Sequence, residues 1–230
     1  MPSIADNVKR ARDAIAEAAL IRGCDPGQIK LVAASKTKSA AEIREAISAG
    51  VDAVGENRQQ EMSQKLAQGA YEDVPLHFIG RLQRNKVKHV VGACALIESV
   101  SSPELLSAIG SRASALGIVQ EILLECNIGE EASKSGAAPG ELSSLLDIAS
   151  ETSGVMVRGL MAIPPISGDF GSSRVYYARM NELFVDIRAK KYDNVSMDFL
   201  SMGMSADFHE SIAEGANMVR LGTAIFGVRA

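Results

Sequence analysis

The chain has 230 residues, of which 47% are hydrophobic and 23% charged, fractions close to globular averages that exclude a disordered or fibrous chain. Its 24 Lys and Arg against 28 Asp and Glu give a net charge of −4, Trp is absent and aromatic residues make up 4%. Neither electrostatic attraction to nucleic acid nor base stacking is therefore favoured. The length predicts one domain over residues 1–230.

The cysteines and the first residues indicate the compartment. Cys24, Cys94 and Cys126 are odd in number, far apart and free of any CxxC pair, which argues against a disulfide framework and against a thiolate zinc site. Charged residues from Asp6 to Asp13 stand where a signal peptide needs an apolar stretch, and no apolar run approaches the length of a membrane span. We expect a cytoplasmic protein without a membrane segment.

The first predicted element is a helix. Ile4, Val8, Ala11 and Ile15 recur at helical spacing and form one apolar stripe. Three further helices have recognisable starts. Ser39 with Glu42 and Asp207 with Glu210 match the capping-box pattern, and Ser102 precedes a proline at the first helical position.

Apolar runs rich in β-branched residues recur about every 27 residues, roughly one strand–helix unit. The predicted strands are 29–35, 51–55, 76–80, 94–99, 119–127, 155–161, 194–201 and 217–222. No Gly-rich GxGxxG turn follows the first strand, so a closed barrel is favoured over an open doubly wound sheet. The fold class is therefore predicted as α/β, a single-domain (β/α)8 TIM-type barrel with an extra N-terminal helix, which we expect to cover the bottom of the barrel.

In such a barrel the working residues lie at the C-terminal ends of the strands. Lys36 follows the first strand and shares a face with Val32 and Ala34. If this face points inward, Lys36 projects from an apolar interior, where desolvation would lower its pKa and free the amine for Schiff-base chemistry. A solvated lysine at a strand end is the alternative interpretation.

The last strand ends in Gly222 and Thr223, at the start of a short helix whose backbone N–H groups could bind phosphate. The seventh strand adds hydroxyls beside them, including Ser201. Arg220 shares the inward face with Gly222 and needs an acceptor, for which a structural carboxylate is an alternative. A lysine across the barrel from a phosphate cradle suggests a phosphorylated carbonyl ligand.

Other polar residues carry weaker signals. The three histidines lack metal-site spacing, so no metal is predicted. Glu56 with Glu61 could be paired carboxylates or solvated side chains, and Lys134 a second amine at the mouth or a surface lysine. A basic cluster after the third strand could attract an anionic ligand or partner, although a solvated helix face is the favoured interpretation; it comprises Arg81, Arg84, Lys86, Lys88 and His89.

Several segments together resemble the pyridoxal phosphate homeostasis protein family, which is similar to the N-terminal barrel domain of alanine racemase. They are LVAASKTK at 31–38, GEN at 55–57, HFIG at 77–80 with LQ and NK after it, KSG at 134–136, RGLMAIP at 158–164, LSMGMS at 200–205 and VRLGTAIFG at 219–227. The resemblance runs in order from the first strand to the last residues. Arg58 departs from it, because many relatives have an aromatic residue there.

The resemblance implies pyridoxal 5′-phosphate (PLP) as a covalent cofactor. The implied binding residues are Lys36, Asn57, Ser201, Arg220, Gly222 and Thr223. Lys36 would form the internal aldimine, Arg220 would face the pyridine nitrogen and Asn57 would line the cofactor's edge. The other three would hold the phosphate.

The resemblance also implies a role in vitamin B6 homeostasis: the protein would hold PLP and supply it to apo-enzymes without strong catalysis, as a monomer. A cationic Arg220 beside the ring nitrogen would keep the ring a weak electron sink, and none of the four tyrosines obviously replaces the acid/base tyrosine of a racemase. A weak PLP-dependent amino-acid racemase is the first alternative. A cofactor-free Schiff-base aldolase acting through Lys36 is the second.

Overall fold

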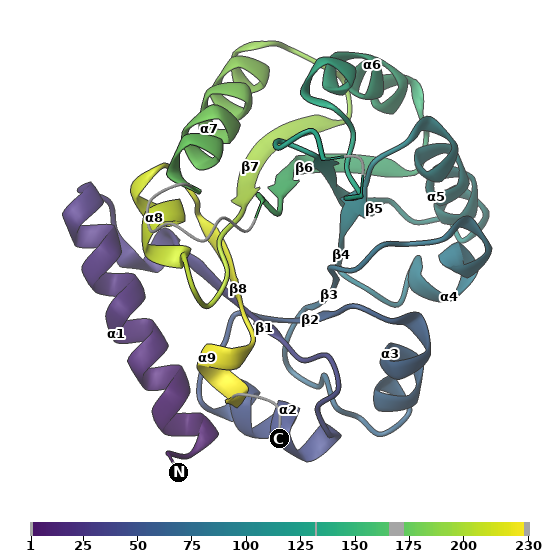
Figure 1. The fold of residues 1–230 in the computed structure, drawn as a ribbon. Coiled ribbons are helices and arrows are strands. Elements are labelled where there is room, and N and C mark those ends of the chain that lie inside the picture. Colours follow the sequence, from purple (N-terminus) through teal and green to yellow (C-terminus); the bar gives the residue numbers. More distant parts are fainter. Residues whose placement is uncertain (1, 132, 166–172, 228–230) are drawn as a thin grey trace.

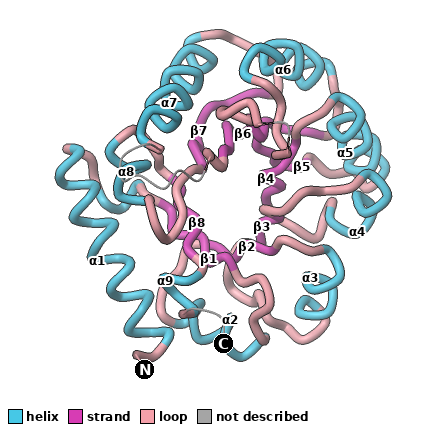
Figure 2. Tube along the Cα trace, viewed as in Figure 1, coloured by secondary structure: helices cyan, strands magenta, loops and turns pink. Residues whose placement is uncertain are grey.

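The computed structural model describes residues 2–131, 133–165 and 173–227. The predicted barrel is confirmed: eight strands form a closed ring in chain order, every neighbouring pair is parallel, and helices surround the ring (Figures 1 and 2). The strands are β1 (Lys30–Ala34), β2 (Ala53–Glu56), β3 (Leu76–Phe78), β4 (Leu96–Val100), β5 (Gln120–Cys126), β6 (Val155–Ala162), β7 (Val195–Ser201) and β8 (Met218–Leu221).

The helices follow the strands on the outside of the ring (Figure 2). They are α1 (Ile4–Arg22), α2 (Ala40–Ser48), α3 (Gln59–Leu66), α4 (Val87–Val90), α5 (Pro103–Ala115), α6 (Leu142–Glu151), α7 (Arg174–Ala189), α8 (Phe208–Ala213) and α9 (Thr223–Phe226). Short 3₁₀ turns precede β1, α4 and α6, at Pro26–Gln28, Arg84–Lys86 and Pro139–Glu141. No helix in the described ranges is long and apolar enough to cross a bilayer.

Strand alternation divides the core into two parts. Val32 and Met218 belong to a small cluster inside the barrel, whereas Leu31 and Ala33, the neighbours of Val32, belong to the large cluster between strands and helices. Because side chains alternate along a strand, Arg220, two residues after Met218, also faces inward. The inward face predicted for this arginine is therefore present.

The expected position of the N-terminal helix is wrong. Helix α1 does not cover the barrel bottom but lies along its outside, against α8, α9 and α2 (Figure 1). The reason is the brevity of α9, whose four residues leave the outer face of β8 and β1 largely uncovered. The buried stripe of α1, including Val8, Ala11 and Ile15, completes the outer layer there.

All three predicted helix starts are confirmed, and two of them have the expected cap hydrogen bonds. The Ser39 hydroxyl accepts a hydrogen bond from the Glu42 N–H while the Glu42 carboxylate accepts one from the Ser39 N–H, and the Ser102 hydroxyl accepts one from the Leu105 N–H. The box at Asp207 is wrong. Its carboxylate accepts from the N–H of residue 204 at 2.7 Å and closes the loop before α8.

Candidate functional site

The C-terminal ends of β1 and β8 bring two predicted site segments together. The strands are neighbours, with Val32 paired to Arg220, and a Cβ added at Gly222 would lie 3.5 Å from the Ala34 carbonyl oxygen. Lys36 therefore lies beside the Gly222 segment, not across the barrel from it as expected. This arrangement brings the turn that carries Lys36 close to the segment that begins at Gly222.

The predicted burial of Lys36 is wrong, because β1 ends at Ala34 and the strand alternation ends with it. Lys36 lies in the turn that follows and is exposed at the barrel mouth. The turn is closed by a 3.0 Å hydrogen bond from the Lys38 N–H to the Ser35 carbonyl. Thr37 has a φ of 66°, a left-handed conformation that is costly for a β-branched residue and that persists only where neighbouring groups hold it.

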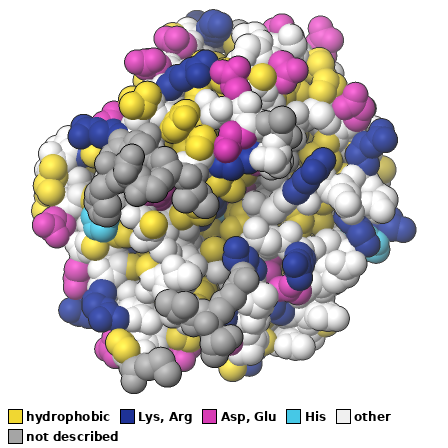
Figure 3. All heavy atoms as spheres, viewed as in Figure 1, with side chains coloured by type: hydrophobic (Ala, Val, Ile, Leu, Met, Phe, Trp, Pro, Cys, Tyr) yellow, Lys and Arg dark blue, Asp and Glu magenta, His cyan; other side chains and the backbone are white. Residues whose placement is uncertain are grey.

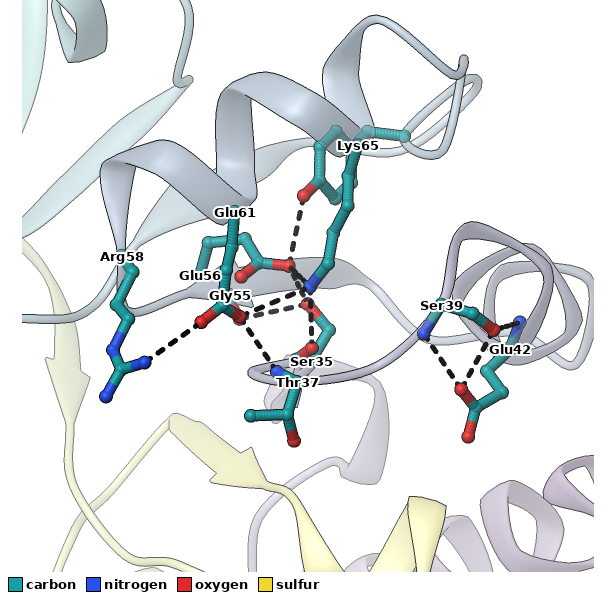
Figure 4. Close-up of polar contacts among 10 residues, drawn as sticks. Ser35, Thr37, Ser39, Glu42, Gly55, Glu56, Arg58, Glu61 and Lys65 are labelled. Carbon is teal, nitrogen blue, oxygen red and sulfur yellow. Dashed lines mark hydrogen bonds and ion pairs between the residues drawn. The ribbon is translucent and has the colours of Figure 1, made fainter.

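A buried ionic network lies directly behind this turn, between the barrel and α3 (Figure 4). The Lys65 ammonium donates to the Ser35 carbonyl at 2.9 Å and pairs with the Glu56 carboxylate at 2.6 Å. The Ser35 hydroxyl and the Tyr71 hydroxyl also donate to this carboxylate, at 2.5 and 3.0 Å. Glu56 is fully buried and Lys65 nearly so.

A second contact from α3 holds the other side of Lys36. The Thr37 N–H donates to the Glu61 carboxylate at 2.9 Å, and Glu61 also lies within ion-pair distance of Lys65 and Arg58 (Figure 4). The residues before and after Lys36 are thus both fixed by α3. The interpretation of Glu56 and Glu61 as a carboxylate pair is wrong: both bind cations or N–H groups behind the turn.

Sequence reasoning missed this network, although part of it had a signal. Lys65 follows Glu61 by four residues, one helical turn, which predicts that the two share a face. Glu56 lies two residues after Val54, an outward-facing core residue, so its carboxylate points out of the barrel toward α3. A charged residue at such a covered position requires a cationic partner.

Beneath the mouth, Arg220 is held inside the barrel by Glu98 and Ser201. Its guanidinium donates to the Ser201 hydroxyl at 2.5 Å and to the Ala162 carbonyl at 3.0 Å, and lies 3.7 Å from Glu98. Ser201 in turn donates to Glu98 at 2.6 Å. The carboxylate partner that sequence reasoning offered as an alternative is therefore present.

Glu98 is fully buried, and its pKa is nevertheless lowered. Burial opposes ionisation, but a 2.8 Å hydrogen bond with His77, together with the charges of His77 and Arg220 and the hydrogen bond from Ser201, outweighs it. The inside of the barrel thus holds a fixed carboxylate under the guanidinium. His77 is buried with its Nδ1 bonded to Glu98, and the described residues contain no group of three metal-ligating side chains.

The N–H groups of the predicted phosphate cradle converge on a hydroxyl. Gly222 and Ala224 each donate to the Ser205 Oγ at 3.1 Å, while Thr223 is exposed. Ser205 belongs to the LSMGMS segment, whose hydroxyls sequence reasoning placed beside this cradle. A phosphate oxygen is a stronger acceptor than a neutral hydroxyl, so these donors fit a phosphate group.

The remaining candidates make no described contact with these groups. Lys134 pairs with Glu131 at 2.6 Å and donates to the Pro164 carbonyl at 2.9 Å, so its amine is engaged. Asn57 is half-buried at the end of β2. Tyr71 and Tyr177 are buried in the outer core, where burial, with neighbouring carboxylates, raises the pKa of both phenols.

Comparison with known proteins shows that the chain is similar to one protein family. The family model described as alanine racemase, N-terminal domain, matches residues 3–230. The pyridoxal phosphate homeostasis protein of Aquifex aeolicus is 40% identical over 97% of both chains, and that of Pseudomonas aeruginosa is 39% identical over 100% of this chain and 97% of its own length. The solved structure of PipY from Synechococcus elongatus with PLP bound has a TM-score of 0.80 and 33% identity, covering 93% of this chain and all of PipY.

Proposed function

The chain belongs to the pyridoxal phosphate homeostasis protein family, and we propose that it holds PLP covalently through Lys36. In the cytoplasm it would supply this PLP to apo-enzymes, without strong catalysis of its own. The observation that carries the proposal is the juxtaposition at the ends of β1 and β8. There the exposed Lys36 amine, in a turn fixed on both sides, lies beside the N–H donors of Gly222 and Ala224. When bound, PLP supplies an aldehyde that reacts with primary amines.

Different residues of the chain would bind different parts of the cofactor. The Gly222 and Ala224 N–H groups, with Thr223, would bind the phosphate, and Ser201 would support them from below. Arg220 would face the ring nitrogen and Asn57 the outer edge. We extend the proposal to the whole chain, residues 1–230, as one PLP-binding domain and to a monomer in solution, which light scattering at several protein concentrations tests.

The site favours binding of PLP without catalysis by the bound cofactor. Arg220 stays cationic and lies beside Glu98, so it would oppose protonation of a ring nitrogen placed against it and weaken the ring as an electron sink. A racemase also needs an acid/base group opposite its lysine. Tyr71 and Tyr177 are buried with raised pKa values, and Tyr176 and Tyr192 pack against the outer core, so none of the four supplies such a group.

Alanine α-hydrogen exchange tests the carrier proposal against the racemase alternative. The PLP-loaded protein is expected to exchange the α-hydrogen of alanine with deuterated solvent at least about 100-fold more slowly than a working racemase, because a positioned base contributes about 10²- to 10⁴-fold. Proton NMR follows the exchange, with an alanine racemase as the reference. Exchange at a rate near that of the reference would replace the carrier proposal with the enzyme one.

Thr223→Ala is expected to weaken PLP affinity about tenfold to a hundredfold, since it removes one hydrogen bond to a charged phosphate. The exposed Thr223 side chain makes no described contact that the fold needs, so the unfolding transition should not move. Thr223→Ser is the matched control and should retain affinity. Fluorescence titration with PLP measures both.

Ser201→Ala is expected to weaken PLP affinity by a similar factor. Unlike Thr223→Ala, it should also lower the free energy of unfolding, because Arg220 and Glu98 each lose a buried hydrogen bond. Unchanged PLP affinity in both alanine variants would place the phosphate elsewhere. The colour of the purified protein separates the aldolase alternative, since a lysine without the cofactor does not absorb visible light.

A further inference from the structure

A cavity of about 630 Å³ lies at the barrel mouth between the loop after β3 and the start of α5. Its polar lining comprises Arg81, Gln83, Arg84, Ser99, Ser101, Ser102 and Glu104. None of these residues belongs to the proposed PLP site. The volume is in the range of small-molecule sites, about 300–1,000 Å³.

Two arginines give this cavity a positive side. Arg81 and Arg84 are exposed, and neither forms an ion pair with any residue in the described part of the chain. Sequence reasoning favoured a solvated helix face for the cluster that contains them. In the structure they project from the loop and 3₁₀ turn beside a cavity, which is a different environment from a helix face.

A buried hydroxyl gives independent evidence for a ligand. Ser99 is 2% exposed and lines the cavity, and its Oγ has no hydrogen-bond partner among the described residues. A buried polar atom without a partner is costly, and a ligand oxygen in the cavity would satisfy it. Ser102 at the rim caps the 13-residue helix α5, so the positive end of that helix dipole also faces this region.

Guanidinium groups, a hydroxyl and a helix N-terminus together favour an oxyanion, and arginine matches the geometry of phosphate in particular. Leu82 and Leu105 add apolar walls, and the cavity exceeds the size of phosphate alone. We propose that this cavity binds a small phosphorylated molecule, with its phosphate on Arg81, Arg84 and Ser99. Glu104, which also lines the cavity, opposes binding; its own backbone N–H and the Ser102 hydroxyl, and to a smaller extent the charge of Arg84, lower the pKa of its carboxyl.

The cavity continues toward the proposed cofactor edge. A smaller cavity of about 160 Å³ shares Arg81, Leu82 and Gln83 with it and extends to Asn57. Figure 3, which views the C-terminal end of the barrel, shows a central hollow with hydrophobic side chains at its floor and Lys and Arg side chains beside it. The phosphorylated molecule would thus lie beside the barrel mouth, whether or not Lys36 carries PLP.

Titration with phenyl phosphate tests the site, in protein first saturated with PLP and reduced with borohydride so that the Gly222 donors are filled. The amide NMR signals of Ser99, Ser102 and Leu105 are expected to shift saturably, whereas phenol, which lacks the phosphate, should shift none of them. The double variant Arg81→Gln/Arg84→Gln should bind at least about tenfold more weakly. Lys88→Gln, an exposed charge outside both cavities, is the matched control and should bind as the parent does.

Two milder variants keep the test decisive if the double variant is poorly folded. Ser99→Ala should weaken binding severalfold without loss of stability, because it removes an unpartnered hydroxyl. Glu104→Gln should strengthen binding, because it removes the opposing charge. Shifts that do not saturate, an equal loss in Lys88→Gln, or shifts centred on Gly222 and Ala224 would each overturn the proposal.

Discussion

Replacing Lys36 with Ala is expected to remove all PLP that borohydride can fix to the protein, together with its visible absorbance. Among the lysines near the mouth, only Lys36 combines an exposed amine, a described environment without hydrogen-bond or ion-pair partners, and a position beside the Gly222 donors. Lys38 pairs with Glu42 at 3.2 Å and donates to the Phe226 carbonyl. Its amine is already engaged.

Peptide mapping after reduction identifies the labelled lysine. Lys38→Ala and Lys134→Ala are the matched controls and are expected to retain the label at Lys36, since both amines are held by carboxylates and carbonyls. Lys36→Ala should still bind PLP weakly through the phosphate donors. A label found chiefly on Lys38 or Lys134 in the parent protein would refute the assignment.

Lys65→Met is expected to lower the free energy of unfolding by about 3–5 kcal/mol, the usual cost of removing one partner from a buried ion pair. Glu56 would stay fully buried with its carboxylate uncompensated, and the Ser35 carbonyl would lose its Lys65 donor. Chemical denaturation monitored by circular dichroism measures the loss.

The matched control is Lys9→Met. Lys9 pairs with Asp13 at 3.5 Å on the exposed face of α1, where an ion pair contributes about 0–1 kcal/mol. The double variant Lys65→Met/Glu56→Leu should recover much of the loss, because it removes the uncompensated charge as well. A Lys65→Met protein as stable as Lys9→Met would show that the buried pair is not needed for the fold.

The barrel was predictable because each strand is an apolar run bounded by turn residues and the runs recur at regular spacing. Strand alternation also placed Arg220 correctly, since β8 includes it. The same rule failed for Lys36, because β1 ends two residues earlier and nothing in the local pattern marks that end. Helix periodicity identified the apolar stripe of α1 but could not tell which neighbours cover it.

The site's buried charges were less predictable for a different reason. Glu98 and Glu56 resemble solvated carboxylates in the sequence, and their burial follows only from the faces that their strands present once the barrel closes. Their partners come from other elements: His77 and Arg220 for the first, Lys65 and Tyr71 for the second. Pairing across separate elements is tertiary information.

The position of α1 over the junction of β8 and β1 bears on how the protein folds as it leaves the ribosome. Asn7 donates to the Ile225 carbonyl and Arg22 to the Ala216 carbonyl, so α1, which is synthesised before all eight strands, makes many of its contacts with the segment from α8 to α9, which is synthesised after β7. Until that segment is made, α1 has α2 but neither α8 nor α9 to pack against, and β1 lacks its neighbour β8. Such long-range contacts slow folding and prolong the exposure of aggregation-prone surface, so nascent chains that still lack β8 are the ones that should depend most on chaperones.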